Sequence, residues 1–317
     1  MTDPHEVAKH YGRPGLADVI LAALKAAGKD IDHLAPDDLA PVDEFHTRGR
    51  AATIDLARFL NLNGNERVLD VGSGIGGPSR YLAKTFGCRV VGLDLTPEFC
   101  RVATMLAERT GLSDKVEYRQ GNALAMPFED LSFDIVWSQN VVMNITDRHQ
   151  LYREIYRVLK PGGRYAFSDV VAGLGGPPYF PMPWAHDPSS SFLLTAKATR
   201  TELGKVGFCI VAFEDQTADA LAQSQARARA ADSPSGLGIH LLLGEDGPTM
   251  YRNGFRNYSE GRIGLVQGTC SANRLMSALP PKADTSADPG LLQQLTCKGL
   301  KDLSLTAETF ELLLRMT

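Results

Sequence analysis

Three glycines, Gly72, Gly74 and Gly76, follow a short apolar stretch that carries an acidic residue, Asp70, near its end. Glycine has no side chain to cover the backbone N–H groups of such a turn, so a ligand can approach them at the start of a following helix. A second acidic residue, Asp94, ends the next apolar stretch and could accept hydrogen bonds from both hydroxyls of a ribose. This spacing predicts a site for an adenosine-containing cofactor.

The glycines alone do not distinguish two kinds of cofactor. Gly72, Gly74 and Gly77 satisfy the G-x-G-x-x-G pattern of dinucleotide sites, whereas Gly72, Gly74 and Gly76 satisfy G-x-G-x-G. The Asp70 carboxylate would repel the pyrophosphate of a dinucleotide. S-adenosylmethionine has no phosphate and carries an ammonium and a sulfonium group, which the same carboxylate would attract. A tight turn without a ligand is the remaining alternative.

Alternating strands and helices are required to position these residues. The hydrophobic pattern predicts strands at residues 67–71, 89–94, 116–120, 133–138 and 164–170, and helices at 78–86, 97–110 and 148–158. Strands near 208–214 and 262–268 would complete the sheet. The expected fold class is α/β, a Rossmann-like, doubly wound, seven-stranded and mostly parallel sheet with an antiparallel edge strand. Its strands would bring Asp70 and Asp94 to one crevice.

Several spaced segments together resemble those of class I S-adenosylmethionine-dependent methyltransferases, over roughly residues 5–270. Residues 70–76 look like the first motif of that family, and residues 120–123 like the segment that borders the adenine. Residues 133–139 and 159–163 look like its fourth strand and the turn into the fifth. The family usually has Asp where this chain has Asn122. The chain is most similar to the branch of sarcosine/dimethylglycine N-methyltransferases and quinone-biosynthesis C-methyltransferases.

The resemblance implies S-adenosylmethionine as the cofactor, a small-molecule methyl acceptor of the amine, quinone or phenol type, and no metal. It also implies in-line methyl transfer, in which the protein aligns two reactants. A base is then needed only for an acceptor that binds protonated. Carried over position by position, the cofactor-binding residues are Asp70, Gly72, Gly74, Gly76, Asp94, Leu95, Asn122, Ala123 and Gln139.

Two residues near the N-terminus are the catalytic candidates. By resemblance, residues 44–49 lie over the methionine end of the cofactor, where His46 could act as a base or orient the acceptor. The alternative is a histidine that caps or packs. Tyr11 could close over the sulfonium, whose positive charge favours an aromatic face. Alternatively, Tyr11 packs its helix onto the core.

A proline-rich insertion at residues 171–198 is the expected lid over the acceptor. Its aromatic residues Tyr179, Phe180 and Trp184, with the pair His186 and Asp187, could enclose an amine or a quinone ring. A loop that only covers the sheet edge is the alternative. A second irregular stretch is expected at residues 231–261.

Asn140 and Asn144 stand where N-methyltransferases of the sarcosine and phosphoethanolamine type tend to have an acid and a histidine. Neither asparagine takes a proton, although both donate and accept hydrogen bonds. This departure weakens the case for an amine and leaves a quinone, a phenol or another neutral acceptor open.

Three parts of the chain are expected. Residues 1–62 form an N-terminal helical lid, with an amphipathic helix near 16–27, a proline- and acid-rich link at 35–44 and a second helix at about 49–61. Residues 63–270 form the S-adenosylmethionine-binding domain. Residues 271–317 are rich in helix breakers and lack periodicity. We hypothesise that they are a read-through or frameshifted tail without a function.

The amino-acid composition limits the kinds of partner that are expected for this chain. A chain of 317 residues that is 44% hydrophobic can bury a large core, and its net charge of −4 without a basic stripe argues against nucleic acid. The sequence lacks the features of a signal peptide and a run of ~18 apolar residues, so a cytoplasmic location is expected. The pattern leaves two functional alternatives, a non-catalytic S-adenosylmethionine-binding module and an NAD(P)-dependent oxidoreductase, and does not determine the oligomeric state.

Overall fold

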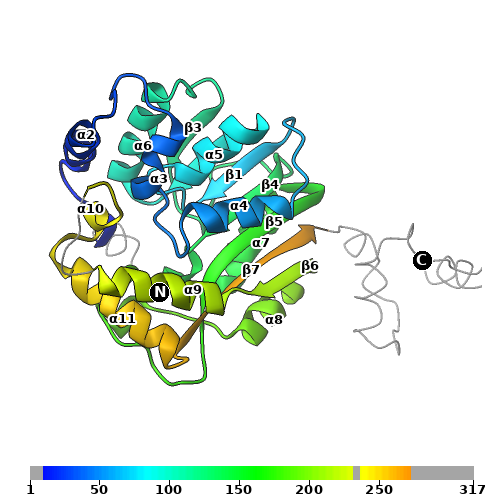
Figure 1. Ribbon diagram of the computed structural model, residues 1–317. Helices are drawn as coiled ribbons and strands as arrows, with labels where there is room; N and C mark the ends of the chain where they lie inside the picture. Colours follow the sequence, from blue (N-terminus) through cyan, green and yellow to red (C-terminus); the bar gives the residue numbers. More distant parts are fainter. Residues whose placement is uncertain (1–9, 231–235, 273–317) are drawn as a thin grey trace, which may run out of the picture.

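The computed structural model describes residues 10–230 and 236–272, and a seven-stranded sheet lies at its centre (Figure 1). The sheet has the strand order β3-β2-β1-β4-β5-β7-β6, in which β7 runs antiparallel to β5 and to the edge strand β6. This confirms the predicted fold class. The strands are β1 (Arg67–Val71), β2 (Arg89–Asp94), β3 (Val116–Gln120), β4 (Phe133–Gln139), β5 (Leu159–Ala172), β6 (Phe208–Asp215) and β7 (Ile263–Ala272).

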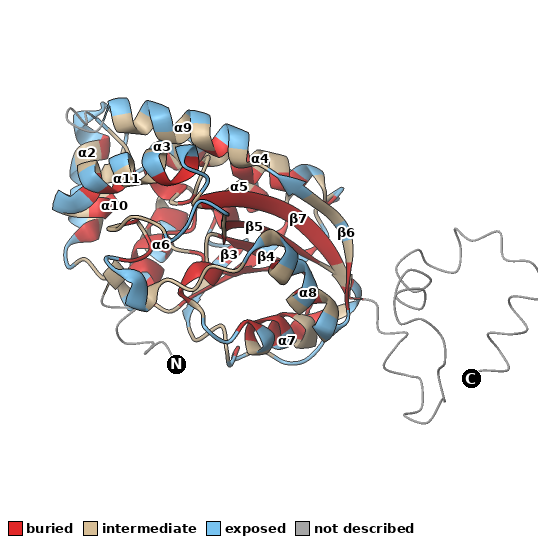
Figure 2. Cartoon of the chain, turned by 90° about the horizontal axis from the view of Figure 1, so that it is seen from below, coloured by how far each residue is buried: buried red, intermediate tan, exposed pale blue. Residues whose placement is uncertain are grey.

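Helices cover both faces of the sheet because alternate strand residues point to opposite sides. On β1, Val68 packs in one cluster with residues of α4 (Arg50–Arg58) and α5 (Gly77–Phe86), whereas Leu69 packs in another with α7 (Arg148–Val158). The clusters also bring α6 (Pro97–Arg109) to the first face and α8 (Ala196–Val206) to the second. Figure 2 shows the buried strands between these exposed helix surfaces.

Two aromatic residues of β4, Phe133 and Trp137, are fully buried and pack in the core. β5 begins at Leu159, five residues before the predicted start, because the turn at residues 160–163 already belongs to the strand. The other four parallel strands match their predicted ranges closely.

Two segments that the sequence pattern marks as irregular contain helices. The expected link at residues 35–44 holds α3 (Pro36–Asp43), since proline fits a first helical turn and the Asp38 carboxylate accepts the Ala35 N–H at 2.9 Å. The stretch at 231–261 holds α10 (His240–Leu243) and α11 (Gly247–Ser259). The prediction of irregular structure was therefore wrong for both segments.

The N-terminal helices share a core with the rest of the chain. Arg80 of α5 and Asp43 of α3 form a fully buried ion pair at 2.8 Å. Leu56 of α4 packs in the cluster that includes Trp137. The first helix of this region, α2 (Leu16–Ala26), packs against α6 and α10. The helices α2, α3 and α4 therefore all pack on the rest of the chain, and the role of this region as a lid stays a prediction.

The expected tail begins two residues too early. Ser271 and Ala272 belong to β7, where they pair with Arg164 and Phe208. The remaining residues of that segment, 273–317, lie outside the described residues. Within residues 10–230 and 236–272, no helix is long and apolar enough to cross a membrane.

Candidate active site

A cavity of about 730 Å³ opens at the carboxyl ends of β1, β2 and β4. Parallel sheets of this kind bind ligands at that edge. Of the residues expected in the site, all except Gly76 line the cavity: Tyr11, His46, Asp70, Gly72, Gly74, Asp94, Leu95, Asn122, Ala123 and Gln139. Segments distant in sequence therefore meet around one space.

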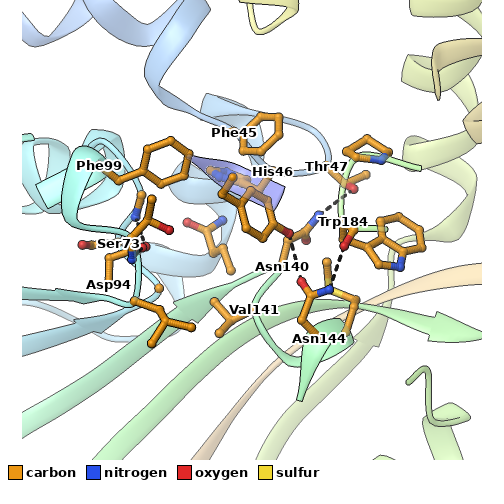
Figure 3. A pocket seen from close by; sticks show the side chains of 18 of the residues that line it. Phe45, His46, Thr47, Ser73, Asp94, Phe99, Asn140, Val141, Asn144 and Trp184 are labelled. Atoms are coloured by element: carbon orange, nitrogen blue, oxygen red, sulfur yellow. Dashed lines mark hydrogen bonds between the residues drawn. The ribbon is translucent and has the colours of Figure 1, made fainter. Parts of the chain in front are cut away.

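The Asp94 carboxylate holds the glycine-rich turn in place. Its two oxygens accept the backbone N–H groups of Gly74 and Thr96, each at 2.8 Å. A carboxylate oxygen can accept more than one hydrogen bond, so both oxygens keep capacity for a ligand hydroxyl. Asp94 thus serves the turn and faces the cavity at the same time (Figure 3).

Asp70 lies near the carboxyl end of β1, where its carboxylate accepts a hydrogen bond of 2.5 Å from the Ser79 hydroxyl at the start of α5. Burial, joined by the nearby charges of Asp94 and Glu44, raises the pKa of Asp70 to about 7 despite the hydrogen bond from Ser79, which lowers it. A cation placed beside this carboxylate would favour its ionised form.

The three glycines of the turn have different surroundings. A Cβ at Gly74 would meet no atom within 4 Å, whereas one at Gly72 would lie 2.4 Å from a Val141 methyl group. At Gly76 a Cβ would lie 2.2 Å from the Tyr118 hydroxyl, behind the turn. Gly76 therefore allows close packing of the turn and does not itself face the cavity.

His46 belongs to a buried polar cluster. Its Nε2 lies 3.0 Å from the Gly49 carbonyl, which can only accept, so this nitrogen carries the proton. Burial, joined by the charge of Arg227, lowers the pKa of His46 to about 4 and outweighs the hydrogen bond to Gly49, which raises it. The imidazole is therefore neutral near pH 7, and Nδ1 is its free acceptor.

Gln139, at the end of β4, has one orientation because two donors fix it. Its Oε1 lies 3.0 Å from the indole nitrogen of Trp137, which can only donate, and 3.2 Å from the Thr53 hydroxyl. The other atom of the amide, Nε2, is buried without a hydrogen-bond partner among the described residues. A donor is thus available to a ligand at the cavity wall.

Tyr11 and the proline-rich insertion meet at Asn144. The Tyr11 hydroxyl donates to Asn144 Oδ1 at 2.9 Å, and Asn144 Nδ2 donates to the carbonyls of Trp184 and Ser190 at 2.7 and 2.9 Å (Figure 3). Asn140 Nδ2 likewise donates to the Thr47 hydroxyl at 3.0 Å. These asparagines therefore join the segments that enclose the cavity.

The residues of the insertion that were expected to enclose the acceptor together do not all lie at the cavity. Trp184 lines the cavity, but His186 lies 3.5 Å from Asp246 with half of its side chain exposed. Asp187 accepts the N–H of Ser189, and Tyr179 stacks between two arginines away from the cavity. A His186–Asp187 pair directed at an acceptor is not formed.

One wall of the cavity was not anticipated. It comes from α9 (Thr217–Arg229) and α11, which lie side by side (Figure 1). We refer to these residues as the helical wall: Ala220, Gln223, Ser224, Arg227, Met250, Tyr251, Gly254 and Tyr258. The spacing of the first four, i, i+3, i+4 and i+7, is the sequence signal that could have revealed one face of a helix.

These surroundings fit S-adenosylmethionine. Asp94 can accept ribose hydroxyls, the open space at Gly74 allows a ligand to approach the turn, and Gln139 offers an unpaired donor. No group of three or more metal-ligating side chains occurs in the part of the chain that the structure describes. Fold and site together define the class of Rossmann-like methyltransferases.

Comparison with known proteins agrees with this class. Residues 69–167 match the family described as a methyltransferase domain. The chain is 30% identical over 213 residues to the sarcosine/dimethylglycine N-methyltransferase of Halorhodospira halochloris, covering 67% of this chain and 75% of that protein. It therefore belongs to the S-adenosylmethionine-dependent small-molecule methyltransferases.

Two further proteins are similar to this chain, one in sequence and one in fold. Methyltransferase GfsG of Streptomyces halstedii is 35% identical over 134 residues, which cover 42% of this chain and 48% of that protein, so the chain spans about half the length of this relative. A crystal structure of geranyl diphosphate C-methyltransferase from Streptomyces coelicolor A3(2), with S-adenosyl-L-homocysteine, shares the fold. Its TM-score is 0.63 at 20% identity, over 85% of this chain and 97% of that one.

Proposed function

We propose that this protein transfers the methyl group of S-adenosylmethionine to a small-molecule acceptor of the amine, quinone or phenol type. The observation that carries the proposal is the single cavity, which joins the glycine-rich turn to the helical wall. Such a cavity can hold cofactor and acceptor end to end, as an in-line displacement requires.

In this proposal the cofactor supplies the electrophilic methyl group, and the protein binds and aligns. Asp94 accepts the ribose hydroxyls, Asp70 faces the ammonium group, and Gln139 donates to the methionine carboxylate. Leu95, Asn122 and Ala123 border the adenine. Gly72 and Gly74 leave room beside the turn, and Gly76 supports it from behind.

We assign His46 and Tyr11 to the reacting end of the cavity. With a pKa of about 4, His46 is a weak base, so its role is to accept a hydrogen bond at Nδ1 and orient the acceptor. Tyr11 is held by Asn144 and lies 6.4 and 6.1 Å from the rings of Phe45 and Phe99, which together form an aromatic cover for the sulfonium.

The test begins with calorimetric titration by S-adenosylhomocysteine, the product form, followed by turnover on a panel of amines, quinones and phenols. Micromolar binding at one site and methylation of a panel member would support the proposal. Binding without turnover would favour the alternative of a non-catalytic S-adenosylmethionine-binding module. Binding of NAD(P) instead would contradict the proposed cofactor. A cytoplasmic location stays a prediction.

A further inference from the structure

Arg227 places a positive charge in the wall of the cavity. It lies in the last turn of α9, one turn beyond the lining residues Gln223 and Ser224, and shares the cavity with them. Its charge also acts on the buried imidazole of His46. The guanidinium group therefore faces the region between the reacting end and the helical wall.

This arginine has no ion pair or hydrogen bond to any residue within 10–230 and 236–272. Besides the neutral imidazole of His46, the phenols of Tyr251 and Tyr258 interact with its charge, and both are neutral. Both ring hydroxyls have raised pKa values because of burial, so they stay protonated near pH 7. Burial lowers the pKa of Arg227 itself, which is the cost of keeping this cation out of water.

The four carboxylates that line the cavity each have a hydrogen-bond or ion-pair partner other than Arg227. Asp43 pairs with Arg80, Asp70 accepts from Ser79, and Asp94 accepts from the turn. The fourth, Asp147, accepts the Gln150 N–H at 2.9 Å and caps α7. Arg227 is half-buried in the cavity wall, and an arginine in such a place is normally compensated, so the missing anion is expected to come from a ligand.

We propose that Arg227 binds an anionic group, a carboxylate or a phosphate, of the methyl acceptor. The inference rests on the proposed function and narrows its substrate class. A guanidinium group offers a planar fork of donors that matches the oxygens of either group. The rest of the acceptor lies against apolar and aromatic residues of the same cavity, which are Met143, Met182, Trp184, Ile239 and Met250.

The acceptor is therefore a molecule with an anionic head and a largely apolar or aromatic body. An amine without an acidic group is disfavoured, because its ammonium form would meet the charge of Arg227. An amino acid or a hydroxyaromatic acid satisfies the site, and so does a phosphate ester.

The experiment compares matched acceptors in pairs. The pairs are N-methylglycine and its methyl ester, a hydroxybenzoic acid and its methyl ester, and phosphoethanolamine and ethanolamine. S-adenosylhomocysteine release is measured with the full chain. We expect the anionic member of at least one pair to have a kcat/KM at least about tenfold higher, mainly through KM. The carboxylate and phosphate pairs distinguish the two kinds of head group.

Three variants connect the preference to Arg227. Arg227→Met should abolish the preference for the anionic acceptor and keep the S-adenosylhomocysteine affinity within about twofold of that of the wild-type chain. Arg227→Lys should retain part of the preference. Arg229→Met is the matched control, because Arg229 lies on the same helical turn, is exposed and lies outside the cavity. If Arg227→Met is not folded, Arg227→Lys provides the comparison.

Three results would overturn the inference. Equal or better turnover of every neutral member is one, and an unchanged preference in a folded Arg227→Met protein is another. Loss of S-adenosylhomocysteine binding in Arg227→Met alone is the third, because Arg227 would then hold the cofactor carboxylate. A wild-type chain that binds no S-adenosylhomocysteine contradicts the proposed function itself, so the two failures are distinguishable.

Discussion

At the scale of single residues, Asp94 has two roles, a contact with the cofactor and support of the glycine-rich turn, whereas the sequence indicates only the first. The expected contact with a ribose is joined by two backbone hydrogen bonds that hold the turn. Charge-assisted hydrogen bonds contribute about 1.5–3 kcal/mol each. A substitution at Asp94 therefore acts on cofactor affinity and on stability together.

We expect Asp94→Ala to lower S-adenosylhomocysteine affinity at least about tenfold, because one ribose hydrogen bond alone accounts for that factor. The thermal midpoint should fall as well, since the N–H groups of Gly74 and Thr96 lose their acceptor. Calorimetry and thermal unfolding measure the two effects. Asp114→Ala, at an exposed carboxylate, is the control. An unchanged affinity would contradict the assigned role of Asp94.

Asp70 predicts a pH dependence of binding. Its pKa of about 7 in the ligand-free fold lies above the ordinary value of 3.8, so the folded chain holds a proton that the unfolded chain releases. The stability that this proton contributes is present at low pH and is lost as the pH rises through about 7. A cofactor ammonium favours the ionised form, so affinity should rise over the same range.

Calorimetry at pH 6, 7 and 8 in buffers of different ionisation enthalpy tests this prediction. About half a proton per site should be released on binding at pH 7, because a group at its pKa is half protonated. Asp70→Asn keeps a group of the same size that does not titrate, and its affinity should be weaker and flatter with pH. A wild-type affinity that falls from pH 6 to 8 would contradict this account.

At the scale of elements, the glycines of the glycine-rich turn have different roles: some are needed for packing of the fold and others leave space for the ligand. Both Gly74 and Gly76 have positive φ, +53° and +85°. A side chain is strained in either conformation by about 1–2 kcal/mol. Of these two positions, only Gly76 is one where an added side chain would also collide with other atoms, those of Tyr118 and of Arg80 in α5.

We therefore expect Gly76→Ala to be destabilised far more than Gly74→Ala, by several degrees or more in thermal midpoint. Gly74→Ala should stay folded and lose S-adenosylhomocysteine affinity, because its methyl group enters the cavity. Each variant is the control for the other. Equal thermal midpoints of the two variants would show that Tyr118 and Arg80 move aside.

At the scale of the whole molecule, β7 completes the sheet and sets where the chain can be shortened. Ala272 is fully buried and pairs with Phe208, and Ser271 pairs with Arg164. We expect a chain shortened to residues 1–272 to keep its thermal midpoint and cofactor affinity. A chain shortened to residues 1–270 should lose several degrees, because it loses ladder hydrogen bonds and buried area. A large loss already at 272 would contradict the hypothesis of a tail without a function.

The sequence by itself determined the sheet, and the residues that it predicted for the cofactor line one cavity, except Gly76. An apolar strand with its acidic residue, Asp70 or Asp94, and the glycines of the turn can be recognised from a few consecutive residues. This is possible because a strand, its turn and the next helix are adjacent in the sequence. The pattern was insufficient for α3 and for α11, because Pro36 and Pro248 stand in first helical turns and Pro41 lies inside α3, and such prolines resemble loop signals.

Only the tertiary structure decided the acceptor end. Asn144 joins Tyr11 to Trp184, and Arg227 comes within reach of His46, although these residues are far apart in the chain. Arg227 reaches the cavity because α9 packs against α11 and β7, and the neutrality of His46 results from its burial. Contacts between distant segments and the loss of solvent around them are properties of the fold, so residue spacing could not reveal them.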